Sequence, residues 1–105
     1  MAWIYLFLAG IAEIGWPVGL KMAQEAGTRI LGIVMAVGFM AISGLLLWLA
    51  QKEIPIGTSY AIWTGIGAAG TFAVGVLFYG DPCSLGRYLG VTLIVAGVAT
   101  LRITH

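Results

Sequence analysis

The sequence predicts an all-α membrane protein whose single domain, residues 1–105, consists of four transmembrane helices. Three observations support this prediction. First, 61% of the 105 residues are hydrophobic and only 9% are charged, whereas soluble domains contain roughly 25% charged residues. Second, the apolar residues fall into four long stretches separated by short polar segments. Third, the mean hydropathy is +1.05, a value that suits a bilayer and not water.

Each apolar stretch is long enough for a helix to cross a membrane. A hydrocarbon core about 30 Å thick requires on the order of 20 helical residues, because each residue adds about 1.5 Å. The fourth stretch is the shortest and reaches this length only marginally. The predicted spans are residues 2–20, 30–50, 56–79 and 85–101.

The polar segments contain residues that end and begin helices. Gly27 suits a helix C-cap, and Thr28 suits the N-cap of the next helix. Pro55 opens the third span, where its missing N–H group costs nothing. Gly80 and Pro82 mark the third turn. Short loops are therefore expected between all four helices.

The composition also excludes several classes of function. No segment carries the basic surface that binds nucleic acid. Cys83 is the only cysteine, so we expect no intrachain disulfide and no cysteine cluster for zinc or iron–sulfur. We also expect no cofactor. Because Cys83 lies in a turn and His105 is the final residue, no nucleophile–base pair is apparent. We therefore expect the protein not to be an enzyme.

The basic residues give almost no bias for one orientation in the membrane. With four spans, Lys52 and Arg102 lie on the side of the termini, and Lys21, Arg29 and Arg87 lie on the other side. Since cytoplasmic loops normally carry an excess of Lys and Arg, this near balance predicts insertion in both orientations. Two antiparallel copies would supply the inverted symmetry that many transporters build from internal repeats.

Glu13 is the one charged residue in the middle of a span. A carboxylate at the centre of a membrane helix costs roughly 2.5–3.5 kcal/mol on insertion scales. One interpretation is that Glu13 is a protonated or hydrogen-bonded packing residue. We favour a functional site, because ionisable residues inside the membrane usually mark substrate or proton pathways.

Helical spacing places aromatic and hydroxyl side chains near this carboxylate. Trp16 follows Glu13 by three residues, and Pro17 lacks the N–H group that would bond to the Glu13 carbonyl. Ser43 is the only hydroxyl residue of the second span. One face of the third span combines hydroxyls, an indole and a gap: Tyr60, Trp63, Thr64, Gly67 and Thr71. This pattern favours a pore-lining face.

The fourth span contains glycines and no charged residue at its centre. Gly90 and Gly97 are seven residues apart and lie on nearly the same helix face. Small residues at such spacing let a second helix approach to backbone distance. We predict that these glycines pack a dimer, the alternative being packing inside a single four-helix bundle.

Taken together, these residues closely resemble the small multidrug resistance family over essentially the whole chain. The segment PIGTSYAIWTGIG at residues 55–67 is the most specific part of the resemblance. It is accompanied by Glu13, Trp16, Lys21, Gly90 and Gly97. Trp16 and the Thr-Gly-Ile-Gly sequence resemble the guanidinium-exporter subtype more than the polyaromatic-cation subtype. Pro17 and the turn at residues 81–84 depart from the usual pattern.

The resemblance implies an antiparallel, dual-topology homodimer in a bacterial inner membrane. In this arrangement, two copies of Glu13 form one central site that binds either a cation or protons, and transport is proton-coupled antiport. By position in the family, Trp16, Ser43, Tyr60 and Trp63 surround Glu13. The same comparison assigns Gly90 and Gly97 to the dimer seam.

Guanidinium suits this set of residues chemically. It is a planar cation, and a carboxylate can accept two parallel hydrogen bonds from it. Each aromatic ring near the site would add a cation–π contact worth roughly 0.5–2 kcal/mol. The predicted function is therefore proton-coupled export of guanidinium and small substituted guanidinium cations.

Three alternatives remain at this stage. The protein can be a broader exporter of quaternary ammonium cations, or one subunit of a heterodimeric pair from the same family. From another class, a small dual-topology ion channel would share the size and the weak charge bias. An anion channel is disfavoured because a buried carboxylate repels anions.

Overall fold

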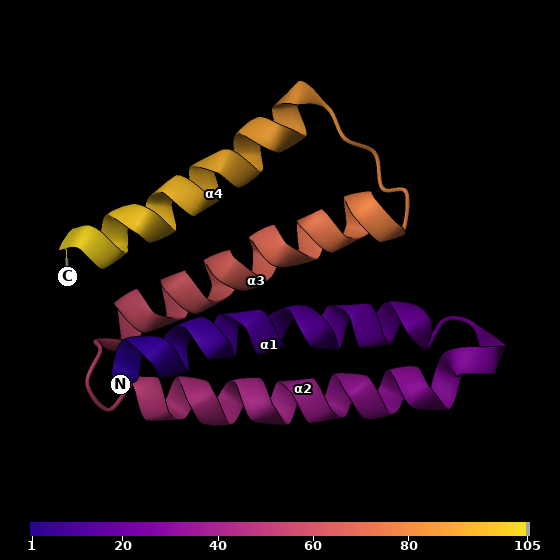
Figure 1. Ribbon diagram of the computed structural model, residues 1–105, viewed down its shortest axis with the longest axis horizontal. Coiled ribbons are helices and arrows are strands. Elements are labelled where there is room, and N and C mark those ends of the chain that lie inside the picture. The colour runs from indigo at the N-terminus through magenta and orange to yellow at the C-terminus, as the bar shows by residue number, and fades with distance from the viewer. Residues whose placement is uncertain (105) are drawn as a thin grey trace.

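The computed structural model describes residues 1–104 as four long helices (Figure 1), and His105 lies outside the described residues. A short 3₁₀ helix, η1 (Ala26–Thr28), precedes the second long helix. The long helices are α1 (Ala2–Met22), α2 (Arg29–Ala50), α3 (Ile56–Phe78) and α4 (Leu85–Thr104). All four are long and apolar enough to cross a membrane. The prediction of an all-α protein with four spans is confirmed.

The first connection differs from the prediction. The C-cap of α1 is Ala23, so the expectation that Gly27 caps this helix is wrong. Thr28 is the N-cap of α2, but its hydroxyl makes no cap bond to that helix. Instead, Thr28 Oγ1 donates to the Met22 carbonyl at 2.6 Å. The last carbonyls of a helix lack intrahelical partners, and this side chain satisfies one of them.

The other two connections are short, as the sequence predicts. Pro55 is the N-cap of α3. After α3, Gly80 adopts a positive φ of 66°, a conformation that glycine reaches without a Cβ penalty. This turn lets the Asp81 N–H group donate to the Gly75 carbonyl at 3.0 Å. The chain therefore folds back over the last turn of α3 before α4 begins.

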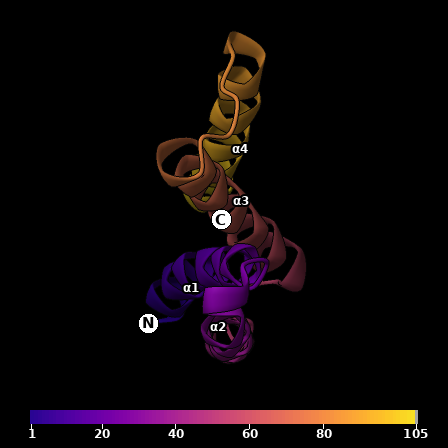
Figure 2. The ribbon, with the colours of Figure 1, turned by 90° about the vertical axis from the view of Figure 1, so that its right-hand side faces the viewer.

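The four helices lie side by side in the order α2, α1, α3, α4 (Figure 1). The Cα atoms span 44 × 34 × 16 Å, so the arrangement is a slab one to two helices thick. Figure 2 shows the same order from the end of the slab. α1 packs along both α2 and α3, and α4 contacts α3. The single chain thus forms an open row and not a closed four-helix bundle.

Glycines permit the close approach of α1 and α2. A Cβ atom added at Gly19 would lie 2.7 Å from both the Ala36 nitrogen and the Gly32 oxygen of α2. Because these neighbours are backbone atoms, they cannot move aside without separating the helices. Small residues at such contacts are typical of helix pairs in membranes, where dispersion contacts drive association.

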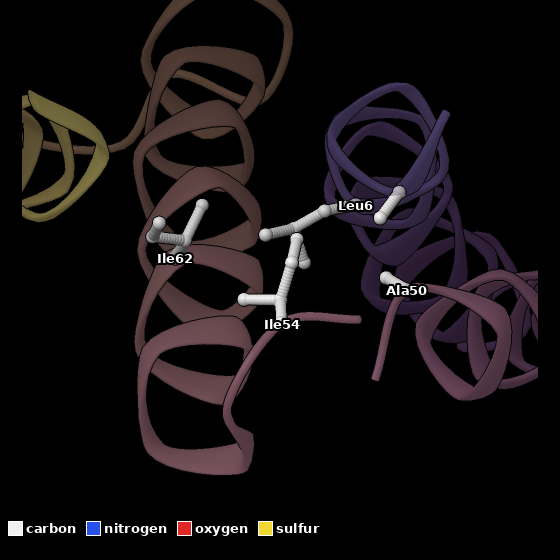
Figure 3. Packing of buried hydrophobic residues seen from close by; sticks show 5 residues of the cluster. Leu6, Ala50, Ile54 and Ile62 are labelled. Carbon is white, nitrogen blue, oxygen red and sulfur yellow. The ribbon is translucent and has the colours of Figure 1, made fainter. Parts of the chain in front are cut away.

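A small apolar cluster fixes the end of the slab where α1 and α3 begin. Leu6 and Ile62 are fully buried, and the loop residue Ile54 is 2% exposed. Figure 3 shows Ile54 extending from the loop toward Leu6, between α1 and α3. Ala2 and Ala50 complete the cluster. The connection between α2 and α3 is therefore packed into the protein at this end.

The fourth helix is the least enclosed element. None of its residues is buried. It meets α3 at Gly65, where an added Cβ would lie 2.5 Å from Val98 Cγ2, and the Phe72 and Tyr88 rings meet edge to face at 6.1 Å. The start of α4 diverges from α3 (Figure 1). Most of its surface is consequently left open within one chain.

We predict that Gly19→Ala lowers the thermal stability of the purified protein in detergent. The added methyl group must push α2 away from α1, and overpacking of this kind typically costs about 1–3 kcal/mol. Gly38→Ala on α2 is the matched control, because a Cβ there meets nothing within 4 Å. Equal melting temperatures for the two variants would contradict the close α1–α2 contact.

Candidate functional site

Glu13 lies roughly midway along α1 and faces α3. Its side chain is half-buried, and its stem packs against Gly67 of α3. A Cβ atom at Gly67 would lie 2.5 Å from Glu13 Cγ. Glycine at this position therefore makes the room that the carboxylate side chain occupies.

The same close contact continues on both sides of Glu13. One turn earlier, a Cβ at Gly10 would lie 2.7 Å from Ile66 side-chain atoms. On the other side, Gly70 of α3 lies directly against the Ile14 side chain. The α3 backbone thus follows α1 closely past the carboxylate, which holds the glutamate side chain in a narrow seam between two helices.

A chain of hydrogen bonds joins three helices near this level. Trp63 Nε1 of α3 donates to Ser43 Oγ of α2 at 2.7 Å. Ser43 Oγ in turn donates to the Ala9 carbonyl of α1 at 2.8 Å. Ser43 is only 1% exposed, so these bonds are shielded from competing donors. Buried polar groups of this kind are costly unless they are paired.

The hydrogen-bond chain ends directly beside Glu13 on the helix backbone. In an α-helix, the Ala9 carbonyl is the acceptor for the Glu13 N–H group. Ser43 therefore adds a second donor to the carbonyl that already holds the Glu13 backbone. At the next turn, Pro17 has no N–H group for the Glu13 carbonyl. The Glu13 N–H group thus bonds to a carbonyl that Ser43 also holds, whereas the Glu13 carbonyl has no N–H partner within the helix.

Two aromatic residues of α3 lie against each other beside this chain of hydrogen bonds. The Tyr60 and Trp63 ring centroids are 5.4 Å apart, with an angle of 53° between the ring planes. Trp63 is held by its bond to Ser43, whereas Tyr60 is 55% exposed. The open ring of Tyr60 leaves an aromatic surface that α1, α2 and α3 do not cover.

Trp16 lies beside Glu13 on α1. The spacing of three residues places its side chain on the same side of the helix as the Glu13 carboxyl group. Within residues 1–104, however, its buried Nε1 has no acceptor at full hydrogen-bonding geometry. An unpaired buried donor costs about 1–3 kcal/mol. The indole is therefore an available donor next to the carboxylate.

The predicted site residues fall into two connected sets and one separate pair. Glu13 and Trp16 form the first set on α1. Ser43, Tyr60 and Trp63 form the second set, which reaches α1 at the Ala9 carbonyl. The separate pair, Gly90 and Gly97, lies on the open surface of α4, where an added Cβ would meet nothing within 4 Å.

The sequence also predicts that Thr64 and Thr71 share the pore-lining face of α3. Thr64 is exposed, and Thr71 lines a pocket between α1 and α3. This pocket also includes Lys21, Tyr79 and Asp81, which sequence reasoning did not bring together. The missing signal is spatial, because Lys21 ends α1 and Asp81 follows α3.

Comparison with known proteins identifies the family. A family model described as Small Multidrug Resistance protein matches residues 1–94. This chain belongs to the small multidrug resistance family. The resemblance stated from the sequence is therefore confirmed, and the four helices belong to a multi-pass protein of the bacterial inner membrane.

Several relatives within the small multidrug resistance family carry the name Guanidinium exporter. The protein of that name from Yersinia pseudotuberculosis is 43% identical over 103 residues, which are 98% of each chain. The one from Salmonella typhimurium strain LT2 is 43% identical and covers 99% of this chain and 98% of its own. The one from Citrobacter freundii is 41% identical and covers both chains fully.

We predict that Ser43→Ala lowers thermal stability more than Ser59→Ala does. Removing the Ser43 hydroxyl leaves the Trp63 indole N–H without its acceptor, a loss of about 1–3 kcal/mol. Ser59 is also buried, but its hydroxyl donates to the Ile56 carbonyl within its own helix at 3.2 Å. Circular dichroism melting of both variants measures the difference, and equal melting temperatures would contradict a bracing role for Ser43.

Proposed function

We propose that this protein exports guanidinium and small substituted guanidinium cations across the bacterial inner membrane by proton-coupled antiport. The working unit of the proposal is an antiparallel, dual-topology homodimer. In it, the two copies of Glu13 form one shared site that holds either the cation or protons.

The observation that carries the proposal is the placement of Glu13. Among the described helices, it is the one charged residue remote from a helix end. The seam against Gly67 accommodates its side chain, and Trp16 supplies an unpaired donor beside it. Tolerating such a charge in a membrane helix is expensive, so we assign to Glu13 the binding of an exchangeable cation.

Guanidinium is the favoured cation for two reasons. Relatives 41–43% identical over nearly the whole chain are named Guanidinium exporter. In addition, a planar cation with forked donors can bind both a carboxylate such as Glu13 and the aromatic rings that we assign to its surroundings. We assign Glu13 as the ligand, and Trp16, Ser43, Tyr60 and Trp63 as the residues that surround the bound cation.

Each residue of the proposed site has its own role in binding the cation. Glu13 accepts hydrogen bonds from the cation, and Tyr60 presents its exposed ring to it. Ser43 fixes Trp63 and thereby holds the indole and the neighbouring Tyr60 ring at a set angle. Trp16 donates to the carboxylate when the cation arrives. The protein thus provides charge, aromatic faces and orientation from three helices.

Exchange follows if the carboxylates are neutralised by either partner. Protons and guanidinium compete for the same oxygens, so a bound proton displaces the cation. If the dimer changes the side of the membrane to which its site opens only when its carboxylates are neutralised, each such change carries either protons or the cation across. Alternating access about a central site is the common behaviour of transporters with inverted symmetry. The proton gradient would then drive cation export.

The open architecture of the single chain supports the homodimer. α4 has no buried residue, and the helices form a row instead of a closed bundle. Gly90 and Gly97 present an uncovered glycine face on α4, which suits close helix pairing. The near balance of basic residues on the two sides favours insertion in both orientations. We therefore assign these glycines to the antiparallel seam.

We predict that Glu13→Gln abolishes guanidinium currents on solid-supported membranes, whereas Glu25→Gln retains them. The amide cannot take up a proton or pair with the cation, and Glu25 lies exposed outside the spans. Wild-type currents should be large with guanidinium and weak with tetramethylammonium from mildly acidic to alkaline pH. Uphill guanidinium efflux driven by a proton gradient in Glu13→Gln would refute the proposed role.

The same recordings separate the other candidate functions. Large tetramethylammonium currents would indicate a broader quaternary ammonium exporter. Guanidinium flux that no proton gradient can drive uphill would indicate a channel. Inactive purified protein that gains activity from a second family member would indicate a heterodimer.

We predict that Gly97→Leu shifts the purified protein from dimer to monomer in detergent. The leucine side chain would separate two helices that meet at the glycine face. Ala99→Leu is the matched control, because residue 99 is exposed on the opposite face of α4. Size-exclusion chromatography with light scattering measures the molar mass. A dimer that survives Gly97→Leu would contradict the proposed seam.

A further inference from the structure

A second polar site lies at the end of the slab where α1 and α3 finish. A pocket of about 190 Å³ opens there between the two helices, and its lining includes Pro17, Lys21, Thr71, Tyr79 and Asp81. For comparison, an engineered protein cavity of about 150 Å³ holds benzene. The pocket is therefore large enough for guanidinium, which is a smaller planar molecule.

The pocket begins one helical turn from Glu13. Pro17 follows Glu13 by four residues on α1, and Thr71 follows Gly67 by four residues on α3. Because Glu13 and Gly67 are in contact, the inner wall of the pocket lies about 5–6 Å along the helices from that contact. The pocket thus adjoins the stretch of the α1–α3 seam that holds the carboxylate.

The outer wall combines an anion and an aromatic ring. Asp81 is held by the bond from its N–H group to the Gly75 carbonyl at 3.0 Å, and its carboxylate lies against Gly75 on the pocket wall. Tyr79 contributes its ring to the same wall. A carboxylate beside an aromatic face is the pair of groups that binds an organic cation.

The ammonium group of Lys21, a cation that belongs to the protein itself, already lies at this wall. Lys21 Nζ is 5.8 Å from the centre of the Tyr79 ring, within cation–π range. No ion pair joins Lys21 to Asp81 in the part of the chain that the structure describes. The ammonium group therefore lies near the aromatic face and does not pair with the neighbouring carboxylate.

The two helix ends add to the preference for cations. α1 and α3 run in the same direction and finish at the same end of the slab (Figure 1). The C-terminus of a helix carries a partial negative charge equivalent to about half an elementary charge. Both partial charges adjoin the pocket, since Lys21 and Tyr79 lie at the ends of these helices.

We propose that the Asp81–Tyr79 wall is a second, outer cation site on the route to Glu13, and that Lys21 is its tethered competitor. An organic cation of the guanidinium class binds there first and displaces the lysine ammonium group from the Tyr79 ring. It then reaches Glu13, one helical turn away, when the close contact of α1 with α3 at Ile14 and Gly70 opens. This inference rests on the proposed cation transport, and it assigns to Lys21 a role in setting apparent affinity.

The test measures the apparent KM for guanidinium by solid-supported-membrane recording on the reconstituted full-length protein. Lys21→Met should lower KM and Asp81→Asn should raise it, each by roughly two- to fivefold, the size of an exposed cation–π or ion-pair contact. Tyr79→Leu should also raise KM. Lys21→Arg keeps the positive charge and should leave KM near the wild-type value.

Matched controls come from the opposite end of the slab. Lys52 and Glu53 are exposed in the loop between α2 and α3, so Lys52→Met and Glu53→Gln make the same charge changes away from the pocket. These two variants should retain the wild-type KM. A purely structural role for the pocket residues would instead reduce the maximal rate or the yield of folded protein, without moving KM in opposite directions.

The outcomes distinguish this inference from the proposed function. An unchanged or raised KM in Lys21→Met overturns the outer site, even if Asp81→Asn fails to fold. A KM shift in the loop controls as large as that in the pocket variants also overturns it. In both cases, wild-type guanidinium currents would leave the proposed export function standing. A wild-type protein that carries no guanidinium current refutes the proposed function itself.

Discussion

The cost of placing a carboxylate inside a membrane helix governs the rest of this structure. Glu13 lies midway along α1, where an ionised side chain is strongly disfavoured by lipid. The surrounding residues provide space for this side chain and a hydrogen-bond donor beside it. Gly67 yields room for the glutamate stem, and Trp16 keeps an indole N–H group beside it. The backbone turn that carries Glu13 is held from α2 through Ser43.

Helix number and approximate span limits follow from composition and length, because a bilayer fixes how many apolar residues a helix needs. The identity of the central carboxylate follows as well, since one charge in mid-span stands out in any sequence. The details of the turns, in contrast, could not be predicted from composition and length. Gly27 suits a helix C-cap by propensity, but Thr28 bonds to the Met22 carbonyl and α1 ends earlier.

Contacts between helices are the part that sequence pattern could not supply. Helical periodicity placed Trp63 and Ser43 on plausible faces, yet their direct hydrogen bond depends on how α2 and α3 flank α1. The pocket at Lys21 and Asp81 likewise depends on two helix ends meeting in space. Spacing within one helix predicts a face, but it does not predict which residue of another helix lies opposite.

The Trp63–Ser43–Ala9 chain has a consequence for movement. It fastens α1, α2 and α3 to one another at a single level through two short bonds, while α4 touches only the edge of this group. Each such bond contributes about 0.5–1.5 kcal/mol. A rearrangement that turns Glu13 toward the opposite side of the membrane must either break at least one of these bonds or tilt the three joined helices as one body. Tilting preserves the bonds, and the three helices then move relative to α4 across the connection between Phe78 and Leu85.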